Sequence, residues 1–188
     1  MLELKNIHKS FDDFRIIDIN LEVKNGDYYV VLGKSGAGKT ILLETIAGLL
    51  IPDKGTVWLD GENITNQSMQ HRRVGLVFQD YAIFPHKTVY QNIAYPLKRK
   101  KNKKGLRDMV FELAEKTGVE NLIHRYPSTL SGGEIQRTVL ARTLALEPEI
   151  LLLDEPLASL DIQYRRELQS LLRKLNADGQ TIVHVTHD

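Results

Sequence analysis

Eight consecutive residues of the chain, GKSGAGKT, fit the pattern G-x-x-x-x-G-K-[ST]. An apolar run precedes them and an amphipathic pattern follows, and this strand–loop–helix context is the one in which the pattern binds phosphate. Glycines allow backbone N–H groups to turn inward around phosphate oxygens, while Lys39 supplies a charge for the β- and γ-phosphates and the Thr40 hydroxyl can ligate Mg²⁺. The alternative is a glycine-rich turn that binds no ligand. The predicted loop comprises Gly33, Lys34, Ser35, Gly36, Ala37, Gly38, Lys39 and Thr40.

Two adjacent carboxylates, Asp154 and Glu155, follow a second apolar run at residues 150–153. A phosphate-binding loop works with an acidic residue at the end of a second buried strand, so we expect Asp154 to hold Mg²⁺ through its water shell. Because the metal would neutralise Asp154, Glu155 would be free to orient or deprotonate an attacking water. Adjacent acidic residues at a strand end can also be solvated or capping groups. The pair favours a hydrolase over a kinase, which needs no water activator.

Four residues of suitable chemistry each stand just past the carboxyl end of an apolar run, namely Gly33, Gln79, Asp154 and His187. Open α/β sheets bind ligands at that edge, so the four residues together predict a single site. Taken alone, Gln79 is an ordinary surface residue type, and other histidines such as His124 lack this context.

The sequence SGGE, from Ser131 to Glu134, predicts a second place where an anion could bind. A serine followed three residues later by glutamate is the pattern of a capping box, so a helix is expected to start there. Ser-Gly-Gly at a helix N-terminus exposes N–H groups to an anion. The alternative is that the segment only caps the helix.

Strands and helices must position these residues. In the first part of the chain, apolar residues alternate with polar ones, which predicts half-buried strands of an antiparallel layer: Leu2, Leu4, Ile17, Ile19, Leu21, Val23, Val57 and Leu59. Continuous apolar runs predict strands of a parallel sheet covered on both faces, at residues 28–32, 74–78, 150–153 and 182–185. Helical stripes lie at residues 41–50, 109–114 and 168–175. Residues from about 85 to 131 carry no convincing strand and are interpreted as a helical insertion.

The chain of 188 residues is long enough for one domain with a sizeable core. Its 42% hydrophobic and 26% charged residues exclude a disordered chain, and the lack of cysteine excludes disulfides, thiolate zinc sites and thiol nucleophiles. No apolar run approaches the ~18 residues of a membrane-spanning helix, and the first residues lack the apolar stretch of a signal peptide. We therefore expect a soluble, cytosolic protein.

One strongly basic run, KRKKNKKGLR at residues 98–107, carries seven positive charges and no negative one. The rest of the chain has 18 positive charges against 24 negative ones. The first interpretation is a solvated loop between elements, and the second is attraction to anionic lipid headgroups. Nucleic acid comes third, because no aromatic residues interleave with the run to stack bases.

The sequence LSGGE, at residues 130–134, resembles the signature motif of the ATP-binding subunits of ABC transporters. It precedes LLLDEP by that family's usual interval, and five motifs occur in the family's order over residues 1–188. The resemblance implies an α/β fold, a P-loop NTPase with a RecA-like, mostly parallel sheet. It also implies an N-terminal antiparallel β layer (about 1–26 and 55–70), a helical subdomain (about 85–136) and a core formed by the remainder. Since the family normally continues well beyond His187, the C-terminal end of the usual domain is expected to be missing.

The resemblance also implies roles for single residues. Gln79 would contact Mg²⁺ and the water, His187 would contact the γ-phosphate, and Glu155 would activate the water. Asp161, in the sequence Ser-Leu-Asp, matches a loop that crosses a dimer interface, although it could equally cap a helix. Phe11 lies where the family places an aromatic ring against adenine, with a core or surface aromatic as the close alternative.

In the family, the signature binds the γ-phosphate of ATP held by the opposite subunit. The residues that would do so here are Ser131, Gly132, Gly133 and Glu134, and the resemblance therefore implies a head-to-tail homodimer with two ATP molecules at its interface. Two positions depart from the family pattern. Lys34 replaces a common proline, and Glu134 replaces a commoner glutamine, which puts a carboxylate near the partner's phosphates but also serves the capping box.

The implied function is Mg²⁺-dependent ATP binding and hydrolysis that drives solute import through a separate integral membrane permease. The subunit would lie at the cytoplasmic face of the inner membrane, with an extracytoplasmic solute-binding protein as an indirect partner and no nucleic acid. FQDYAIFPH resembles the importer branch that serves oxyanions, sugars, polyamines and iron, and NLIHRYPSTLSGGE leans towards molybdate, tungstate or sulfate. The alternative is a soluble ABC-type ATPase of DNA repair or translation, which would carry a long coiled-coil insertion or two tandem cassettes. A third hypothesis, a switch that binds ATP without hydrolysis, is disfavoured by Glu155.

Overall fold

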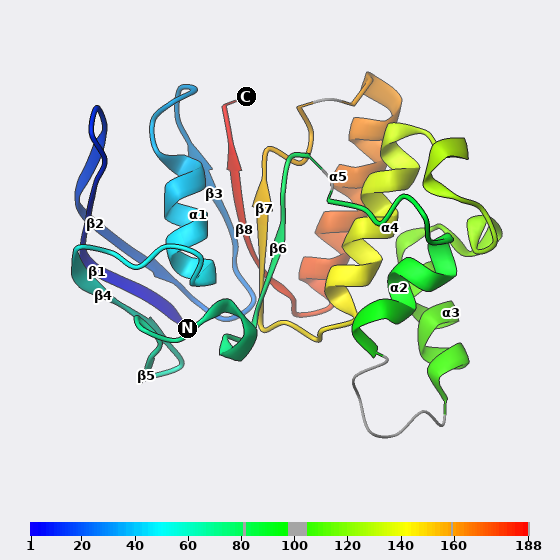
Figure 1. Cartoon of the computed structure of the whole chain (residues 1–188), viewed down its shortest axis with the longest axis horizontal. Helices are drawn as coiled ribbons and strands as arrows, with labels where there is room; N and C mark the ends of the chain where they lie inside the picture. Colours follow the sequence, from blue (N-terminus) through cyan, green and yellow to red (C-terminus); the bar gives the residue numbers. More distant parts are fainter. Residues whose placement is uncertain (81, 98–104, 159, 188) are drawn as a thin grey trace. The chain divides into compact units, whose positions relative to one another are not determined.

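The computed structural model describes residues 1–80, 82–97, 105–158 and 160–187, which group into two compact units (Figure 1). Unit 1 consists of Met1–Leu76, Glu149–Glu155 and Leu175–Asp188, and unit 2 consists of Val77–Pro148 and Pro156–Lys174. Unit 1 holds the strands almost entirely, and unit 2 holds most of the helices. Within the described ranges, no helix is both long and apolar enough to cross a membrane.

A four-stranded antiparallel sheet in unit 1 has the order β2-β1-β4-β5, and it confirms the expected antiparallel layer. Leu4 of β1 pairs with Leu21 of β2 and with Val57 of β4, and the side chains of Leu4 and Val57 are buried. The strands are β1 (Leu2–Ser10), β2 (Arg15–Val23), β4 (Lys54–Leu59) and β5 (Glu62–Asn63).

The alternation of apolar residues breaks within β2 at Asp18, whose φ of 56° is left-handed. The pairing with β1 shifts register in the same region. As a result Ile16 is only 7% exposed, whereas Ile17 is 53% exposed. The prediction that Ile17 lies on the buried face is wrong, because the irregularity offsets the two-residue period along the strand.

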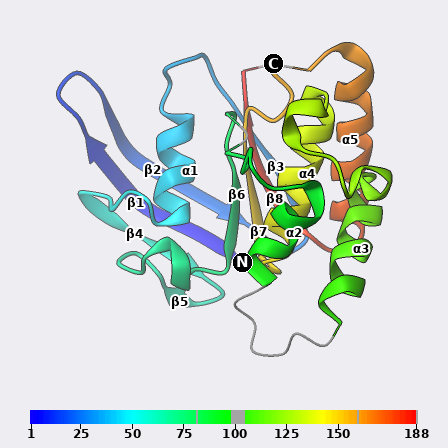
Figure 2. The same cartoon turned by 45° about the vertical axis from the view of Figure 1, so that its right-hand side comes forward.

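The second sheet has the strand order β3-β8-β7-β6, which can be followed in Figure 1, whereas its strands overlap in the turned view of Figure 2. Strand β8 pairs in parallel with both β3 and β7, and every residue of β7 and β8 is buried. The expected parallel sheet is therefore present, and the carboxyl ends of β3, β7 and β8 share one edge. The strands are β3 (Tyr28–Leu32), β6 (Val74–Val77), β7 (Ile150–Asp154) and β8 (Thr181–Thr186).

Strand β3 differs from the expectation that the parallel strands are covered on both faces. It lies at the end of the strand order, and Val30 and Leu32 are 45% and 69% exposed in the described structure. An edge strand has a strand neighbour on one side only, so its apolar sequence alone did not guarantee burial.

Helix α1 (Lys39–Ala47) follows β3 through the glycine-rich loop. Gly38 precedes the helix with a φ of 90° and Gly48 follows it with a φ of 80°, and both values are left-handed. The helix predicted over residues 41–50 is therefore too long, because the N–H of Gly48 caps the last turn and the chain leaves the helix there.

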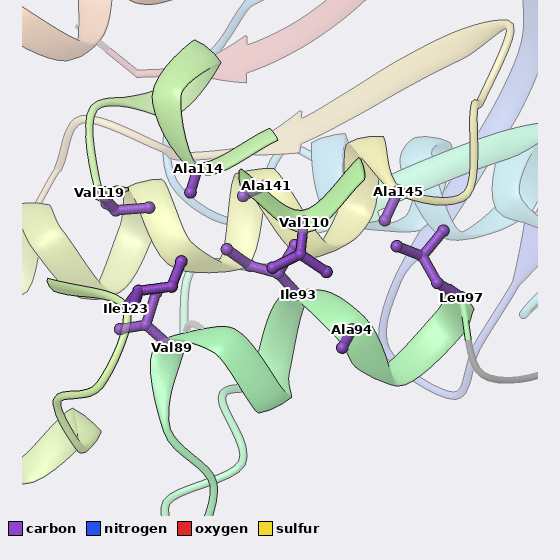
Figure 3. Close-up of a cluster of buried hydrophobic side chains, with 10 residues drawn as sticks. All are labelled: Val89, Ile93, Ala94, Leu97, Val110, Ala114, Val119, Ile123, Ala141 and Ala145. Atoms are coloured by element: carbon purple, nitrogen blue, oxygen red, sulfur yellow. The ribbon is translucent and has the colours of Figure 1, made fainter. Parts of the chain in front are cut away.

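Unit 2 is a helical layer in which α2, α3 and α4 meet at one apolar cluster (Figure 3). The cluster comprises Val89, Ile93, Ala94, Leu97, Val110, Ala114, Val119, Ile123, Ala141 and Ala145. The described residues between 85 and 131 contain no strand, in agreement with the sequence, whereas residues 98–104 of the basic run lie outside the described residues. The helices are α2 (Val89–Leu97), α3 (Leu106–Thr117), α4 (Gly132–Leu144) and most of α5 (Ile162–Ala177), with the short helices η2 (Glu120–Leu122) and η3 (Pro127–Thr129).

Candidate functional site

The glycine-rich loop begins directly after β3, at the edge where β8 also ends. The N–H of Gly33 donates to the carbonyl of Thr186, at 3.3 Å, which ties the start of the loop to the end of β8. Gly38 has no room for a side chain, since a Cβ there would lie 2.8 Å from Ile16 and 2.9 Å from the Phe14 ring. The loop is thus fixed at both ends, and its glycines allow the turn that leads into α1.

Lys39, the first residue of α1, has a largely buried side chain. Its ammonium donates to the carbonyl of Gly33 at 2.7 Å and to that of Lys34 at 3.1 Å. The same nitrogen lies 3.6 Å from Oε1 of Glu155. A fixed positive charge therefore sits inside the loop, where it can attract phosphate oxygens.

Thr40 and Asp154 meet between α1 and the end of β7. The Thr40 hydroxyl donates to Oδ2 of Asp154 at 3.0 Å, whereas Oδ1 of Asp154 is buried and has no hydrogen-bond partner within the described residues. Burial is the main cause that raises the pKa of Asp154, and the nearby charge of Glu155 raises it further, against the hydrogen bond from Thr40. A hydroxyl beside a carboxylate with a free buried oxygen is a donor set that fits Mg²⁺.

Glu155 follows β7 with a left-handed φ of 47°. Its N–H donates to the carbonyl of Val185 in β8 at 3.1 Å, which supports this uncommon conformation. Its Oε2 lies 2.8 Å from Nδ1 of His187, and because a carboxylate only accepts, Nδ1 is the donor. The carboxylate therefore lies between the Lys39 ammonium and the His187 ring, with its side chain mostly buried.

Unit 1 thus brings together the loop of residues 33–40, Asp154, Glu155 and His187, which include three of the four strand-end residues, whereas the fourth, Gln79, lies in unit 2. Phe11, also in unit 1, is 43% exposed, and the Lys9 ammonium lies 5.9 Å from the centre of its ring. Gln79 and Asp161 are exposed residues of unit 2, and the signature residues 131–134 lie in the same unit, so none of these residues belongs to unit 1.

The capping box predicted from Ser131 and Glu134 is present at the start of α4. The N–H of Glu134 donates to the Ser131 hydroxyl at 3.4 Å, and the N–H of Ser131 donates to the Glu134 carboxylate at 2.7 Å. This backbone hydrogen bond is the main cause that lowers the pKa of Glu134. The carboxylate that departs from the family pattern is thus used to cap the helix.

Asp161 caps helix α5, which is the alternative that the sequence left open. Its Oδ1 accepts from the N–H of Tyr164 at 3.2 Å. Ser159, which precedes it in the Ser-Leu-Asp sequence, lies outside the described residues.

Two buried polar residues of unit 1 were not singled out from the sequence. His184, in the middle of β8, hydrogen-bonds through Nδ1 to the Tyr28 hydroxyl at 3.1 Å, and burial lowers its pKa. Arg72 donates to carbonyls at the end of α1 and to the carbonyls of Thr65 and Gln67, which shortly precede Arg72 in the chain. Burial lowers the pKa of Arg72 to about 10. A polar residue inside or beside an apolar strand run was the only sequence signal for either.

A glycine-rich loop between a strand and a helix, with a carboxylate at the end of another strand of the same parallel sheet, defines a P-loop NTPase. Residues 16–158 match the family described as ABC transporter, and the chain belongs to this family, of which it carries the ATP-binding domain. The fold is that of ABC ATPase cassettes.

Among its relatives, the chain is 44% identical over 189 residues to the molybdate/tungstate import ATP-binding protein WtpC of Pyrococcus horikoshii, with 100% of this chain and 55% of the relative covered. It is 47% identical over 188 residues to the sulfate/thiosulfate import ATP-binding protein CysA of Mesostigma viride, with 98% of this chain and 54% of the relative covered. The chain thus spans about half the length of the curated relatives it matches. A solved dimeric ATP-binding cassette in a post-hydrolysis state, bound to ADP and Pi, superposes with a TM-score of 0.86 at 33% identity, with 100% of this chain and 88% of that chain covered.

Proposed function

We propose that the protein binds ATP with Mg²⁺ at the edge formed by β3, β7 and β8, and hydrolyses it. The observation that carries this proposal is the position of the Glu155 carboxylate, 3.6 Å from the Lys39 ammonium and bonded to His187. An alternative use of this arrangement is ATP binding without turnover, and a mostly buried carboxylate beside the phosphate loop favours hydrolysis.

The residues of unit 1 divide the chemistry among them. Lys39 holds the β- and γ-phosphates by its charge, and Thr40 and Asp154 hold Mg²⁺. A Mg²⁺ ion held there would supply positive charge against the phosphate oxygens. Glu155 orients or deprotonates the attacking water, and His187, whose Nδ1 donates to that carboxylate, contacts the γ-phosphate. Phe11 stacks on the adenine.

We further propose that the signature residues of unit 2 act on ATP held by a second copy of the chain, so that the protein works as a head-to-tail homodimer. The start of α4 supports an anion site, because a helix N-terminus directs backbone N–H groups outward and the capping box of Ser131 aligns the first turn. Asp161 and Gln79 act at the same shared sites. The dimeric state of a solved cassette with 33% identity is in keeping with this assembly.

The partner that the ATPase drives is a separate membrane permease, and the transported solute is an oxyanion such as molybdate, tungstate or sulfate. This proposal rests on the import functions in the names of WtpC and CysA. The subunit lies at the cytoplasmic face of the membrane, with a solute-binding protein as an indirect partner. Unit 2 offers a contact surface for a permease at an aromatic and basic cluster, in which the half-exposed Tyr95 packs on Phe84, with ring centres 4.6 Å apart, beneath Lys87.

The test is the substitution Glu155→Gln, which keeps the shape of the side chain and removes its basicity. We expect phosphate release to fall at least about 100-fold, while the Kd for ATP measured by calorimetry stays within about threefold. The matched control Glu112→Gln changes an exposed glutamate of α3 and should leave the rate unchanged. Near-normal turnover of Glu155→Gln would show that another group accepts the proton.

A further inference from the structure

Gly133, in the first turn of α4, is a glycine for which the backbone gives no reason. It is buried, and its φ is not left-handed. A Cβ at this position would lie 3.1 Å from Cδ1 and Cγ of Tyr164 and 3.2 Å from Cβ of Tyr164. These distances are tighter than ordinary van der Waals contact, so the tyrosine occupies the space that a side chain would need.

The neighbouring glycine of the signature is different. Gly132 is exposed, and among the described residues a Cβ there would meet Leu160 alone, at 4.0 Å, which is ordinary contact. The two glycines therefore have different roles within the chain itself. Within the described part of the chain, Gly133 is the one of the two that packs against another helix.

Tyr164 is held in place by the segment that precedes α5. Its N–H donates to Asp161 at 3.2 Å, and this cap fixes the turn from which the ring projects. Farther along the two helices, Arg137 of α4 pairs with Glu167 of α5 at 2.8 Å. The Gln136 amide of α4 also donates to the carbonyl of Pro156. All of these residues belong to unit 2, so the ring and the first turns of α4 form one packed element.

We propose that Tyr164 is a positioning residue for the signature. Its ring is the surface on which the backbone of Gly133 rests, and it thereby sets the direction of the N–H groups at the start of α4. A smaller side chain at position 164 would let the first turn of α4 move towards α5. A larger side chain at position 133 would move that turn away from the ring. The packing stands on the contacts alone, whereas the consequence for phosphate binding rests on the proposed function.

The test is a double-mutant cycle with Gly133→Ala, Tyr164→Ala and the two combined. We expect Gly133→Ala to lower the urea midpoint of unfolding and to lower the ATPase rate roughly 100-fold, since a small misplacement of a binding group has effects of this size. Tyr164→Ala alone lowers the rate about tenfold, as binding groups lose their fixed position. The combined variant removes the two ring contacts at 3.1 Å and keeps only the contact with Cβ of residue 164, at 3.2 Å, so we expect a partial recovery, with both the midpoint and the rate above those of Gly133→Ala.

Two controls separate positioning from general damage. Tyr164→Phe keeps the ring and should match the wild type in both measurements. The effects of Gly132→Ala should add to those of Tyr164→Ala without any rescue, because that glycine does not touch the ring. If the Tyr164→Ala background does not fold, Tyr164→Ser, whose small hydroxyl can rotate away from position 133, provides a second background for the same cycle.

A second readout isolates phosphate binding from turnover. In a Glu155→Gln background, ATP-dependent dimer formation measured by sedimentation should be lost with Gly133→Ala and regained with the combined change. If the effects of Gly133→Ala and Tyr164→Ala on the urea midpoint simply add in the combined variant, the proposed packing is wrong. If the midpoint recovers in the combined variant but neither dimer formation nor the rate does, the positioning role is wrong. A wild-type protein that neither dimerises with ATP nor hydrolyses it would instead overturn the proposed function, and the unfolding cycle would still decide the packing.

Discussion

His184 is a buried histidine three residues before His187, and the environment of its ring is unusual for a titratable group. Nδ1 is bonded to the Tyr28 hydroxyl, and Nε2 is buried without a hydrogen-bond partner in the described structure. Burial lowers the pKa of His184 below its ordinary 6.5, while the charge of Glu155 acts in the opposite direction. The folded protein therefore favours the neutral ring.

This pKa shift predicts a loss of stability in acid. Because the folded pKa lies below the unfolded one, the contribution of His184 is fully present above about pH 6.5 and is lost as the pH falls through the folded pKa. We expect the free energy of unfolding in urea to fall by at most ~1.4 kcal/mol per pH unit in this window on account of this group. The slope should be reduced in His184→Gln.

The matched control is His124→Gln, which changes an exposed histidine of unit 2. It should keep the pH dependence of the wild type. Equal slopes for the wild type and His184→Gln between pH 6.5 and pH 5 would show that the ring is as easily protonated in the folded protein as in the unfolded one.

At the scale of elements, Arg72 joins helix α1 to the chain that returns from the antiparallel sheet. Its guanidinium donates to the carbonyls of Thr45 and Ile46, at 2.7 and 2.6 Å, and to those of Thr65 and Gln67, at 2.8 and 2.9 Å. The first two acceptors lie in the last turn of α1, where a cation is favoured by the helix dipole. Arg72 thus anchors the far end of the helix that starts at the phosphate loop.

A lysine ammonium cannot donate to all four of the carbonyls that the planar guanidinium of Arg72 reaches. We expect Arg72→Lys to lower the free energy of unfolding by ~3 kcal/mol, since carbonyls of a buried network lose their donor. The neighbouring Arg73→Lys serves as control, because Arg73 is exposed and pairs with Glu149 at the surface. That change should cost less than about 1 kcal/mol. Similar losses for the two variants in urea unfolding would contradict the anchoring role.

The sequence predicted the elements well where a single period or a local motif decided them. The sequence predicted the bounds of β3, the capping box at Ser131 and the end-of-strand carboxylates, because each depends on neighbouring residues in the chain. The errors lie where one residue interrupts a period. Asp18 offsets the alternation in β2, and Gly48 ends α1 before the apolar stripe does.

Contacts between distant segments could not be predicted in the same way. Arg72 reaches α1 across 26 residues of chain in its bond to Ile46, and Tyr164 meets Gly133 from another helix. Neither pairing leaves a periodic signal in the sequence, since each depends on how packed elements happen to face one another. The exposure of Leu32 in β3 has the same origin, because strand order decides which apolar run lies at an edge.

At the scale of the whole molecule, the proposed site is divided between the two units. The phosphate loop, Asp154, Glu155 and His187 belong to unit 1, whereas the signature belongs to unit 2. A head-to-tail dimer would complete each site with the signature of the other copy. Activity should then rise more steeply than linearly with protein concentration, because monomers lack a complete site.

Mixing two inactive variants tests this central claim most directly. Lys39→Ala disables the phosphate loop, and Ser131→Arg places bulk and charge in the signature, so each protein alone should release almost no phosphate from ATP. In a heterodimer, one site combines the intact loop with the intact signature, and the other carries both defects. An equal mixture at high protein and saturating ATP should regain at most about a quarter of the wild-type rate, if copies exchange randomly and sites act independently. Full activity of Ser131→Arg alone, or no recovery on mixing two variants that sedimentation shows to associate, would contradict the shared site.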